Sequence, residues 1–254
     1  MIGKLFGKPK EAHKPAAAGA QGKLADAALR AARDKVSEAA RQDPLAGAKV
    51  AGQEVFHRLL LSMKNEHGVH VESMLCVLGA LAGYACQAEV RAIARAKTLP
   101  DAAVFQIVST ADGRQYYFGD LLNQPLLNAQ PSLWGMVGAS ALQAGATALP
   151  DPHALFRHVA ASVGDAGFGI PRVPAKHKAG DTPLAYLKQL WPVLFPLVRA
   201  ICPQPALWPV VFGVAIQRTI EASKDVIDGG LAFTIAMEAA VPMSKVDLGG
   251  IDGI

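Results

Sequence analysis

The stretch Ser73-Met-Leu-Cys-Val-Leu-Gly-Ala-Leu-Ala-Gly-Tyr-Ala-Cys-Gln-Ala88 decides the fold, because it is apolar all round when it is wound into a helix. It carries no charge and is too short to span a bilayer. Its small residues, Gly79 and Gly83 among them, let a neighbouring helix approach closely. We therefore expect a helix over about 70–97 whose first half forms the centre of the core and whose second half emerges into water.

Helical patterns continue on both sides of this stretch. A helix over about 46–65 carries a broad apolar face, and the chain over 119–241 alternates helical segments with proline-rich joints. The exception is 103–118, where two β-rich runs flank Asp112-Gly113, a dipeptide that favours a hairpin turn. The sequence therefore predicts a mainly α protein, a multi-helix globular bundle with one β-hairpin near 103–118.

Two tryptophan segments suggest that this bundle contains duplicated helical hairpins. Pro131-Ser-Leu-Trp-Gly and Pro205-Ala-Leu-Trp-Pro begin stretches in which Pro, Leu, Trp, Val, Ala and Gln coincide without a gap. Each stretch is followed by a second predicted helix that begins at an Asp. If the duplication is real, Trp134 and Trp208 should occupy the same pocket relative to the following helix. If the match is chance, their surroundings should differ.

The positive charge of the chain is concentrated at its N-terminus. The formal net charge is +4, but residues 1–41 hold nine Lys and Arg against four Asp and Glu, and the rest is nearly neutral. We expect a disordered basic tail over 1–20 and a single helical domain over 21–243, in which 21–43 is a peripheral helix. A flexible C-terminal tail is expected over 244–254.

The charge distribution and the cysteines limit the partners and the compartment. A near-neutral body has no field to attract a phosphate backbone, so the sequence argues against a nucleic-acid partner despite a pI of about 9.0. Residues 1–10 alternate apolar and basic side chains and provide at most a weak membrane contact. No signal peptide is recognisable, and Cys76, Cys86 and Cys202 resemble reduced core cysteines, so we expect a cytoplasmic protein.

The joint before the central helix, Glu66-His-Gly-Val-His-Val-Glu72, holds two imidazoles and two carboxylates. Divalent metal ions take such nitrogen and oxygen ligands, so His67, His70 and Glu72 are candidate metal ligands. The alternative is that these polar side chains solvate the joint, with Glu72 complementing the positive end of the helix dipole. No resident cofactor is predicted, and a divalent metal is the one candidate.

A second candidate site is the loop over 167–183, which is rich in glycine and proline and holds the densest basic group in the body of the chain. Its candidate binding residues are Arg172, Lys176, His177 and Lys178. Long ordered loops often bind ligands, and a phosphate or an acidic partner surface would suit these side chains. The alternative is a solvated crossover loop.

Three further residues are candidates for a site. His153 and His158 lie on a predicted helix and would reach a cleft beside it, although solvation accounts for them as well. Glu238 lies in an otherwise apolar helix. If it is buried, it needs a partner such as Arg199 or Arg218.

Common catalytic motifs are missing from the chain. It lacks the standard phosphate-binding loop, the dinucleotide-binding fingerprint, the Gly-x-Ser-x-Gly elbow and His-Glu-x-x-His. We therefore expect a non-catalytic helical protein-interaction module, such as an adaptor, a scaffold or an immunity-type binder. The alternative is an enzyme, or a protein that binds a small ligand or a metal in a cavity between helices.

Overall fold

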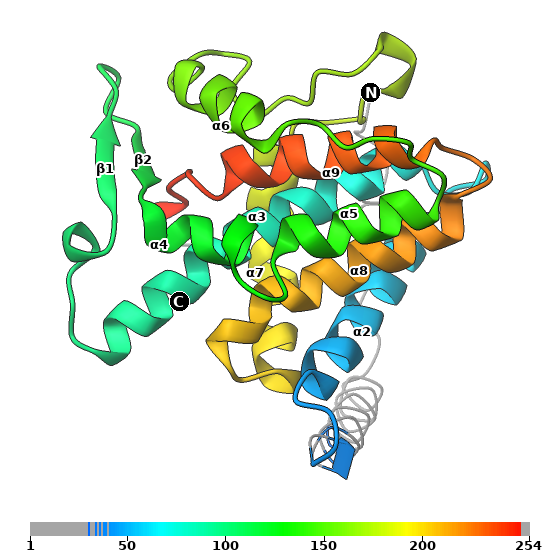
Figure 1. Cartoon of the computed structure of the whole chain (residues 1–254), viewed down its shortest axis with the longest axis horizontal. Coiled ribbons are helices and arrows are strands. Elements are labelled where there is room, and N and C mark those ends of the chain that lie inside the picture. The colour runs from blue at the N-terminus through cyan, green and yellow to red at the C-terminus, as the bar shows by residue number, and fades with distance from the viewer. Residues whose placement is uncertain (1–29, 31–33, 35, 37, 40, 250–254) are drawn as a thin grey trace, which may run out of the picture.

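The apolar stretch forms the first half of α3 (Val71–Ala96), which runs through the centre of the molecule (Figure 1). The computed structural model describes residues 30, 34, 36, 38, 39 and 41–249. Every residue from Ser73 to Ala88 is buried, whereas Ile93 and Arg95 near the end of α3 are exposed. The prediction of a central core helix that emerges into water is therefore confirmed.

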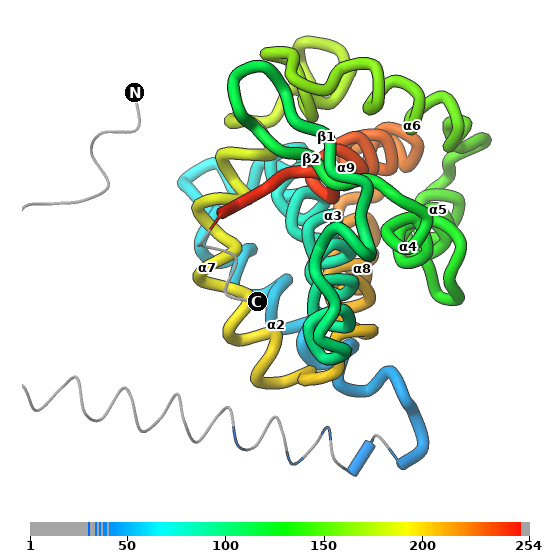
Figure 2. Tube along the Cα trace, turned by 90° about the vertical axis from the view of Figure 1, so that its left-hand side faces the viewer, coloured from blue at the N-terminus to red at the C-terminus, as the bar shows by residue number. Residues whose placement is uncertain are grey.

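Long helices pack against α3 on several sides (Figures 1 and 2). They are α7 (Pro183–Ile201), α8 (Trp208–Ser223) and α9 (Gly229–Met243). A further helix, α2 (Ala46–Ser62), packs against α8 and α7. Aromatic rings fill the space between α3 and α7: Trp191 stacks on Phe195 and meets Tyr84 edge-on, with ring centroids 4.3 Å and 4.8 Å apart. Offset and edge-on pairs of this kind add specific geometry to the apolar burial.

The glycines of α3 bring α9 unusually close. A Cβ atom placed on Gly83 would lie 2.8 Å from the Cα atom of Ala240, and one placed on Gly79 would lie 3.0 Å from the Cα atom of Ala236. The obstructing atoms belong to the α9 backbone, which cannot rotate away as a side chain can. The small residues noted in the sequence therefore set the distance between the two helices.

The remaining helical segments are α4 (Asp120–Asn123), α5 (Leu133–Gln143) and α6 (Pro152–Ala161), with single turns at 101–103, 124–128, 175–177 and 205–207. α5 packs against α8 and α9, α6 packs against α9, and α4 packs against α3 (Figure 1). Side chains cap two of these helices: Ser132 Oγ accepts the Gly135 N–H, and Asp151 accepts the N–H groups of His153 and Ala154. The predicted multi-helix bundle is confirmed.

β1 (Gln106–Ser109) and β2 (Gln115–Phe118) form the predicted hairpin. They pair antiparallel, with Ile107 opposite Tyr117. Gly113 in the turn has a φ of 83°, a left-handed conformation that glycine adopts without strain. No other strand is found in the described part of the chain, so the prediction of one hairpin in a mainly α protein holds.

The segment after α9 returns to the hairpin and runs beside β2 (Figure 2). The Tyr117 N–H donates to the Lys245 carbonyl at 2.8 Å, and Gln87 Nε2 of α3 donates to the Ser244 carbonyl at 2.9 Å. Ser244 and Lys245 are almost fully buried. The expectation of a flexible tail over 244–254 is therefore wrong at the start of this segment, because backbone pairing with the hairpin and the Gln87 amide hold the chain there. The last five residues of the segment lie outside the described part of the chain.

The two tryptophan segments have different surroundings. Trp134 in α5 packs edge-on against Phe233 of α9, with ring centroids 4.8 Å apart. Trp208 in α8 packs edge-on against Phe195 of α7 and donates its indole N–H to the Cys202 carbonyl. The structure therefore does not support duplicated hairpins. The shared residues reflect two similar helix starts whose partners are set by their positions in the bundle.

Few positions before α2 are described. The helical ones are Arg30, Asp34, Val36, Glu38 and Ala39, and of these five Val36 is the one that is partly buried. The predicted tail over 1–20 and most of the predicted helix over 21–43 lie outside the described residues.

Among the described residues, α3 is long and apolar enough to cross a membrane, and α7 with α8 passes the same test as one span broken by a bend of 115°. However, 89% of the tested window of α3 is buried inside the protein. A core helix passes this test as readily as a membrane helix, so the finding leaves the location of the protein open.

Candidate functional site

The loop between α6 and α7 crosses the upper edge of the bundle in Figure 1. We call residues 164–182 the strap. Its backbone hydrogen bonds are local, such as the one from the His177 N–H to the Pro174 carbonyl at 2.8 Å. Thr182 ends the strap by capping α7, where its Oγ1 accepts the Ala185 N–H. Side-chain contacts therefore fix where the strap lies on the bundle.

The first of these contacts joins Arg172 of the strap to Glu238 of α9. The Glu238 carboxylate accepts the Arg172 backbone N–H at 2.6 Å and the Nη2 group at 2.6 Å, and its side chain is 12% exposed. Glu238 is thus buried with a partner, as the sequence requires, but the partner is neither Arg199 nor Arg218. Arg172, one of the predicted binding residues, therefore forms a charge-assisted contact within the protein, while its side chain stays 51% exposed.

The second contact joins the strap to the first turn of α3 through Glu72. The Glu72 carboxylate lies 2.8 Å from Nδ1 of His177 and 3.3 Å from Nε2 of His70, and its side chain is 15% exposed. Partial burial alone would raise the pKa of Glu72. The hydrogen bond with His177 and the charges of both imidazoles outweigh it and bring the pKa below its ordinary value.

Ser73 extends this cluster to a second point on the strap. Its Oγ accepts the Gly180 N–H at 2.9 Å and lies 2.8 Å from Nδ1 of His70. A serine, a histidine and a glutamate are thus joined in the order used by serine hydrolases. The Ser73 hydroxyl is buried under Gly180, however, so the cluster attaches the strap rather than presenting a nucleophile.

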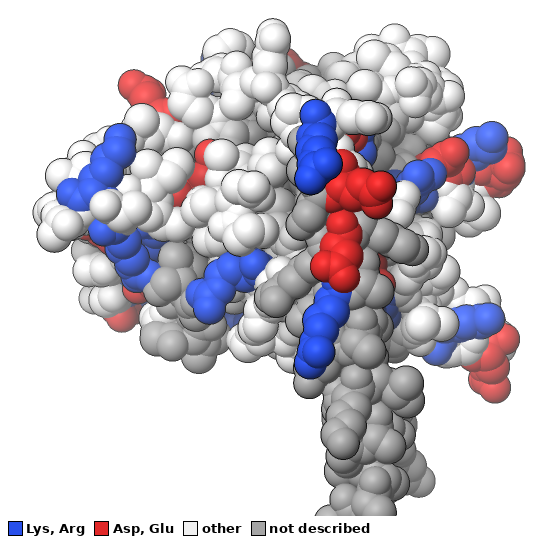
Figure 3. Space-filling model, turned by 90° about the horizontal axis from the view of Figure 1, so that it is seen from below, with Lys and Arg blue, Asp and Glu red and all other residues white. Residues whose placement is uncertain are grey.

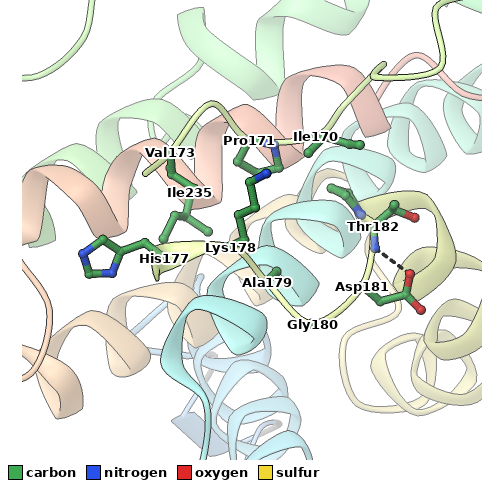
Figure 4. Close-up of a pocket in the computed structure, with 11 residues that line it drawn as sticks. Ile170, Pro171, Val173, His177, Lys178, Ala179, Gly180, Asp181, Thr182 and Ile235 are labelled. Atoms are coloured by element: carbon green, nitrogen blue, oxygen red, sulfur yellow. Dashed lines mark hydrogen bonds between the residues drawn. The ribbon is translucent and has the colours of Figure 1, made fainter. Parts of the chain in front are cut away.

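Two cavities lie beside the strap and share Ile170 and Thr182 as lining residues. The first, of about 300 Å³, lies between the two arms of the strap above Ile235 of α9 (Figure 4). The second, of about 380 Å³, lies between the strap, the hairpin and α7. We call the two together the cleft. Ile170 is 42% exposed where they meet, so the cleft has an apolar surface open to solvent.

Cationic side chains border this apolar surface. Figure 4 shows the Lys178 side chain reaching from one arm of the strap toward Pro171 on the other. Lys178 and Lys188 line the first and second cavity, and neither forms an ion pair within the described part of the chain. Arg114 differs, because Asp112 and the Gly164 carbonyl already accept its N–H groups. Asp181, Asp165 and Asp247 line the same cavities, so the two lysines are local positive charges in a lining of mixed sign.

The opposite face of the molecule has a different character (Figure 3). Seen from below, positive and negative side chains mostly lie next to each other rather than forming a patch of one sign. On α2, Lys49 pairs with Asp43 at 2.6 Å and Arg58 pairs with Glu54 at 2.7 Å. Paired charges of this kind give little net field for a charged partner.

The other predicted site residues are dispersed. The His67 side chain is 85% exposed, with its imidazole 3.3 Å from the Glu66 carboxylate, while His153, His158 and Lys176 are exposed on α6 and the strap. No group of three His, Cys, Asp or Glu in the described ranges is placed to hold a metal. The candidate ligands His70 and Glu72 are close together, but the imidazole nitrogen points at a carboxylate oxygen instead of sharing a vacant centre with it.

Sequence reasoning named Glu72 and His177 as candidates for two different sites, but it missed their pairing and it missed Ser73 and Lys188. Glu72 and His177 are 105 residues apart, and no local pattern relates them. The sequence contains a weak indication that Ser73 has a distant partner, because its hydroxyl lies in the first turn of an apolar helix, where a polar group without a local role needs one. The sequence contains no such indication for Lys188, because an exposed lysine on an amphipathic helix is ordinary.

Two titratable groups are buried away from the cleft. Burial raises the pKa of Glu89 in α3 to about 7. Burial lowers the pKa of Lys245 to about 8, and its ammonium lies 5.5 Å from the ring centroids of Phe118 and Phe156 and 3.4 Å from Oδ1 of Asn123. These groups make the stability of the fold depend on pH.

Comparison with family models, curated proteins and solved structures gives no match to this chain. The geometry and charge of the cleft are therefore the basis for assigning a function.

Proposed function

We propose that the protein is a non-catalytic interaction module that binds an acidic, partly apolar segment of a partner protein in the cleft. The observation that carries this proposal is the position of Lys178 and Lys188, which form no ion pair with any described residue, beside the exposed apolar surface of Ile170. Carboxylates of a partner would pair with the lysines while its apolar side chains cover Ile170. Such complementarity favours a partner of defined charge.

The shape of the cleft favours an extended segment over a compact molecule. Two separate cavities meet at Ile170 and Thr182, so successive side chains of one segment can enter different cavities. Pockets for alternate side chains are the usual source of specificity when extended peptides bind.

The nucleophilic groups support a binding role rather than catalysis. Burial raises the pKa of Cys76 to about 12 and that of Cys202 to about 11, and it also raises the pKa of Cys86. Thiols of this kind are poor nucleophiles because the thiolate is scarce. The Ser73 hydroxyl accepts the Gly180 N–H under the strap.

We further infer a cytoplasmic location, since Cys76, Cys86 and Cys202 are free and buried, as suits a reducing compartment. A nucleic-acid partner is not part of the proposal, because the charges on the face seen in Figure 3 are largely interspersed. The weak membrane contact expected of residues 1–10 falls outside the described residues and contributes nothing to it.

One observation favours a second function, the binding of a small amphipathic carboxylate. The first cavity alone has a volume of about 300 Å³, the lower end of the range for small-molecule sites, and Lys178 lies across it. This cavity lies between a loop and α9, whereas the sequence suggested a ligand cavity between helices.

Fluorescence anisotropy with two short fluorescein-labelled peptides tests the proposal. Leucine alternates with aspartate in one peptide and with lysine in the other. The full-length protein should bind the acidic peptide with a Kd below about 1 mM, bind the basic one more weakly, and lose affinity as salt is added. Reversing both cleft charges, Lys178→Glu with Lys188→Glu, should weaken binding about tenfold or more.

Lys64→Glu is the matched control, because Lys64 is exposed and lies outside the cleft. Failure of the acidic peptide to bind, or equal binding by the double variant and the wild type, would overturn the proposal. A thermal shift with decanoate that Lys178→Glu abolishes, in the absence of peptide binding, would establish the small-ligand function instead.

A further inference from the structure

We propose that the groove between α2 and α8 is a second docking surface, which binds an amphipathic α-helix of a partner protein with acidic residues at its C-terminal end. This inference goes beyond the proposed function, because the groove shares no lining residue with the cleft. It is carried by the shape of the groove and by the change in its lining from polar to apolar along its length.

Three cavities join along the line where α2 and α8 lie side by side (Figure 1). Their volumes are about 490, 400 and 360 Å³. The first and second share Gln53, Arg218 and Glu221 as lining residues, and the second and third share Phe56 and Ala222. We call the three cavities together the helix groove, in which the first cavity is the polar end and the third is the apolar end.

The lining residues follow both helices in the same direction. On α2 they proceed from Lys49 at the polar end to Leu61 at the apolar end, and on α8 they proceed from Val214 to Ser223. The helix groove is therefore a valley between two parallel helices. The helix from Lys49 to Leu61 is about 18 Å long at about 1.5 Å per residue. A valley of this length accommodates a further helix of about three turns, whose side-chain ridges fit between those of α2 and α8.

The apolar end is suited to the apolar face of such a helix. Leu61 is 76% exposed there, and Lys64 is the one charged residue among the described residues that line this cavity. Ala222 is exposed on the α8 side, and its small side chain lets another helix approach closely. A docked helix would remove further apolar surface from water, because the lining includes the half-buried side chains of Phe56, Leu60, Val69 and Val71.

The polar end carries more positive than negative charge. Its charged lining residues are Lys49, Arg218, Lys224 and Glu221. Lys49 pairs with Asp43 at 2.6 Å, and Arg218 pairs with Glu221 at 3.1 Å. Lys224 is exposed and forms no ion pair within the described part of the chain. An acidic side chain on the docked helix would therefore find its partner in Lys224.

Amide groups make the polar end suitable for the C-terminal turn of a helix in particular. Gln53 and Gln143 line this end and are exposed, so their N–H groups are available to a partner. The last carbonyl groups of a helix have no partner within it, and they form the negative end of the helix dipole. Ammonium and amide donors complement both properties. Charge and hydrogen bonding thus favour a helix whose acidic C-terminal end lies near Lys224.

Fluorescence anisotropy with a fluorescein-labelled, alanine-based helical peptide tests the proposal. The peptide carries leucines along one face of its N-terminal half and glutamates along the same face of its C-terminal half. The full-length protein should bind it with a Kd below about 1 mM. A second peptide with a proline at its centre cannot form a continuous helix and should bind about tenfold more weakly or worse. A third peptide, with lysines in place of the glutamates, should also bind more weakly.

Leu61→Asp places a charge at the apolar end and leaves the core intact, because Leu61 is exposed. It should weaken binding of the first peptide about tenfold or more. Val193→Asp is the matched control, since Val193 is 69% exposed on α7 and lines none of the three cavities. Lys224→Glu should weaken binding about two- to fivefold. Lys97→Glu, at an exposed position after α3, should leave it unchanged.

Failure of the glutamate peptide to bind, equal binding of the three peptides, or wild-type affinity in Leu61→Asp would overturn the proposal. Self-association of the free protein that Leu61→Asp abolishes would assign the helix groove to a second copy of the chain instead. A thermal shift with dodecanoate that Leu61→Asp abolishes, in the absence of peptide binding, would assign it to a single-chain lipid. Either result would also overturn the proposal.

Discussion

Replacing Gly83 by alanine places one methyl group where α3 and α9 touch. In most helices this change is favourable by about 1 kcal/mol, because alanine loses less backbone entropy than glycine. Here the new Cβ atom would lie 2.8 Å from the Ala240 Cα atom and closer still to its carbonyl group. Carbon atoms in a well-packed core are separated by about 3.5–4.0 Å. The helices must therefore move apart by about 1 Å.

The cost of this movement exceeds the gain in helix propensity. Overpacking a core costs about 1–3 kcal/mol, and more where the obstacle cannot change rotamer. The obstacle at Gly83 is α9 backbone, so the upper end of that range applies. After the propensity gain is subtracted, we expect Gly83→Ala to lower the free energy of unfolding by at least about 2 kcal/mol. For a chain of this size the melting temperature should fall by about 4–8 °C.

Urea unfolding followed by circular dichroism at 222 nm measures this effect. Gly167→Ala is the matched control, because a Cβ atom on Gly167 meets nothing within 4 Å. It should leave stability unchanged or raise it slightly. If Gly83→Ala were as stable as Gly167→Ala, the close approach of α3 and α9 would not govern the packing of the core.

Three further predictions concern buried titratable groups and thiols. The pKa of Glu89 is raised to about 7, so the folded state binds more protons than the unfolded state between about pH 4.5 and 7, and stability falls as the pH rises through this range. Glu89→Gln should remove this dependence on pH. Measured by urea unfolding at about pH 8, its free energy of unfolding should be about 1–3 kcal/mol higher than that of the wild type. If the free energy of unfolding changed with pH in the same way in both proteins, the prediction would be contradicted. The pKa of Lys245 is lowered to about 8, so the folded state binds fewer protons between about pH 8 and 10.5, and stability rises with pH there. Lys245→Met should make stability less dependent on pH in this range and should stabilise the protein at about pH 7 by about 1–3 kcal/mol. A loss of stability would mean that the contacts of the Lys245 ammonium with Phe118 and Phe156 outweigh the cost of burying its charge. Finally, the three cysteines should not react with a thiol reagent such as DTNB in the native protein, because all three are buried. All three should react once guanidinium chloride has unfolded the protein. Rapid labelling of the native protein would show instead that its core opens.

The elements that were predicted correctly are those whose signal is local. The run from Ser73 to Ala88 has apolar side chains in every direction, and a helix with that pattern must be surrounded. Asp112-Gly113 supplies the left-handed conformation that the hairpin turn needs, whatever the rest of the fold does. Patterns of this kind show which face of an element is buried.

Such patterns do not show what covers that face, and the incorrect predictions are of this kind. Glu238 was expected to need a cation, but the choice between Arg172 and more distant arginines depends on how the strap crosses α9. The pairing of His177 with Glu72 depends on the same crossing. At Lys245, backbone pairing with β2 determines the structure. Nearly every residue has the same backbone N–H and carbonyl groups, so the sequence does not show which of them pair.

The contact between α3 and α9 also has a consequence for biosynthesis. Gln87 and Ser244, which close one end of this contact, are 157 residues apart in the chain. At about 5–20 residues per second, a ribosome needs about 8–30 s to make the intervening segment. During that time α3 has no partner for the face that carries Gly79 and Gly83. The nascent chain thus exposes this face of α3 until α9 has been made, and a chaperone that covers the face during this interval would have most effect on the yield.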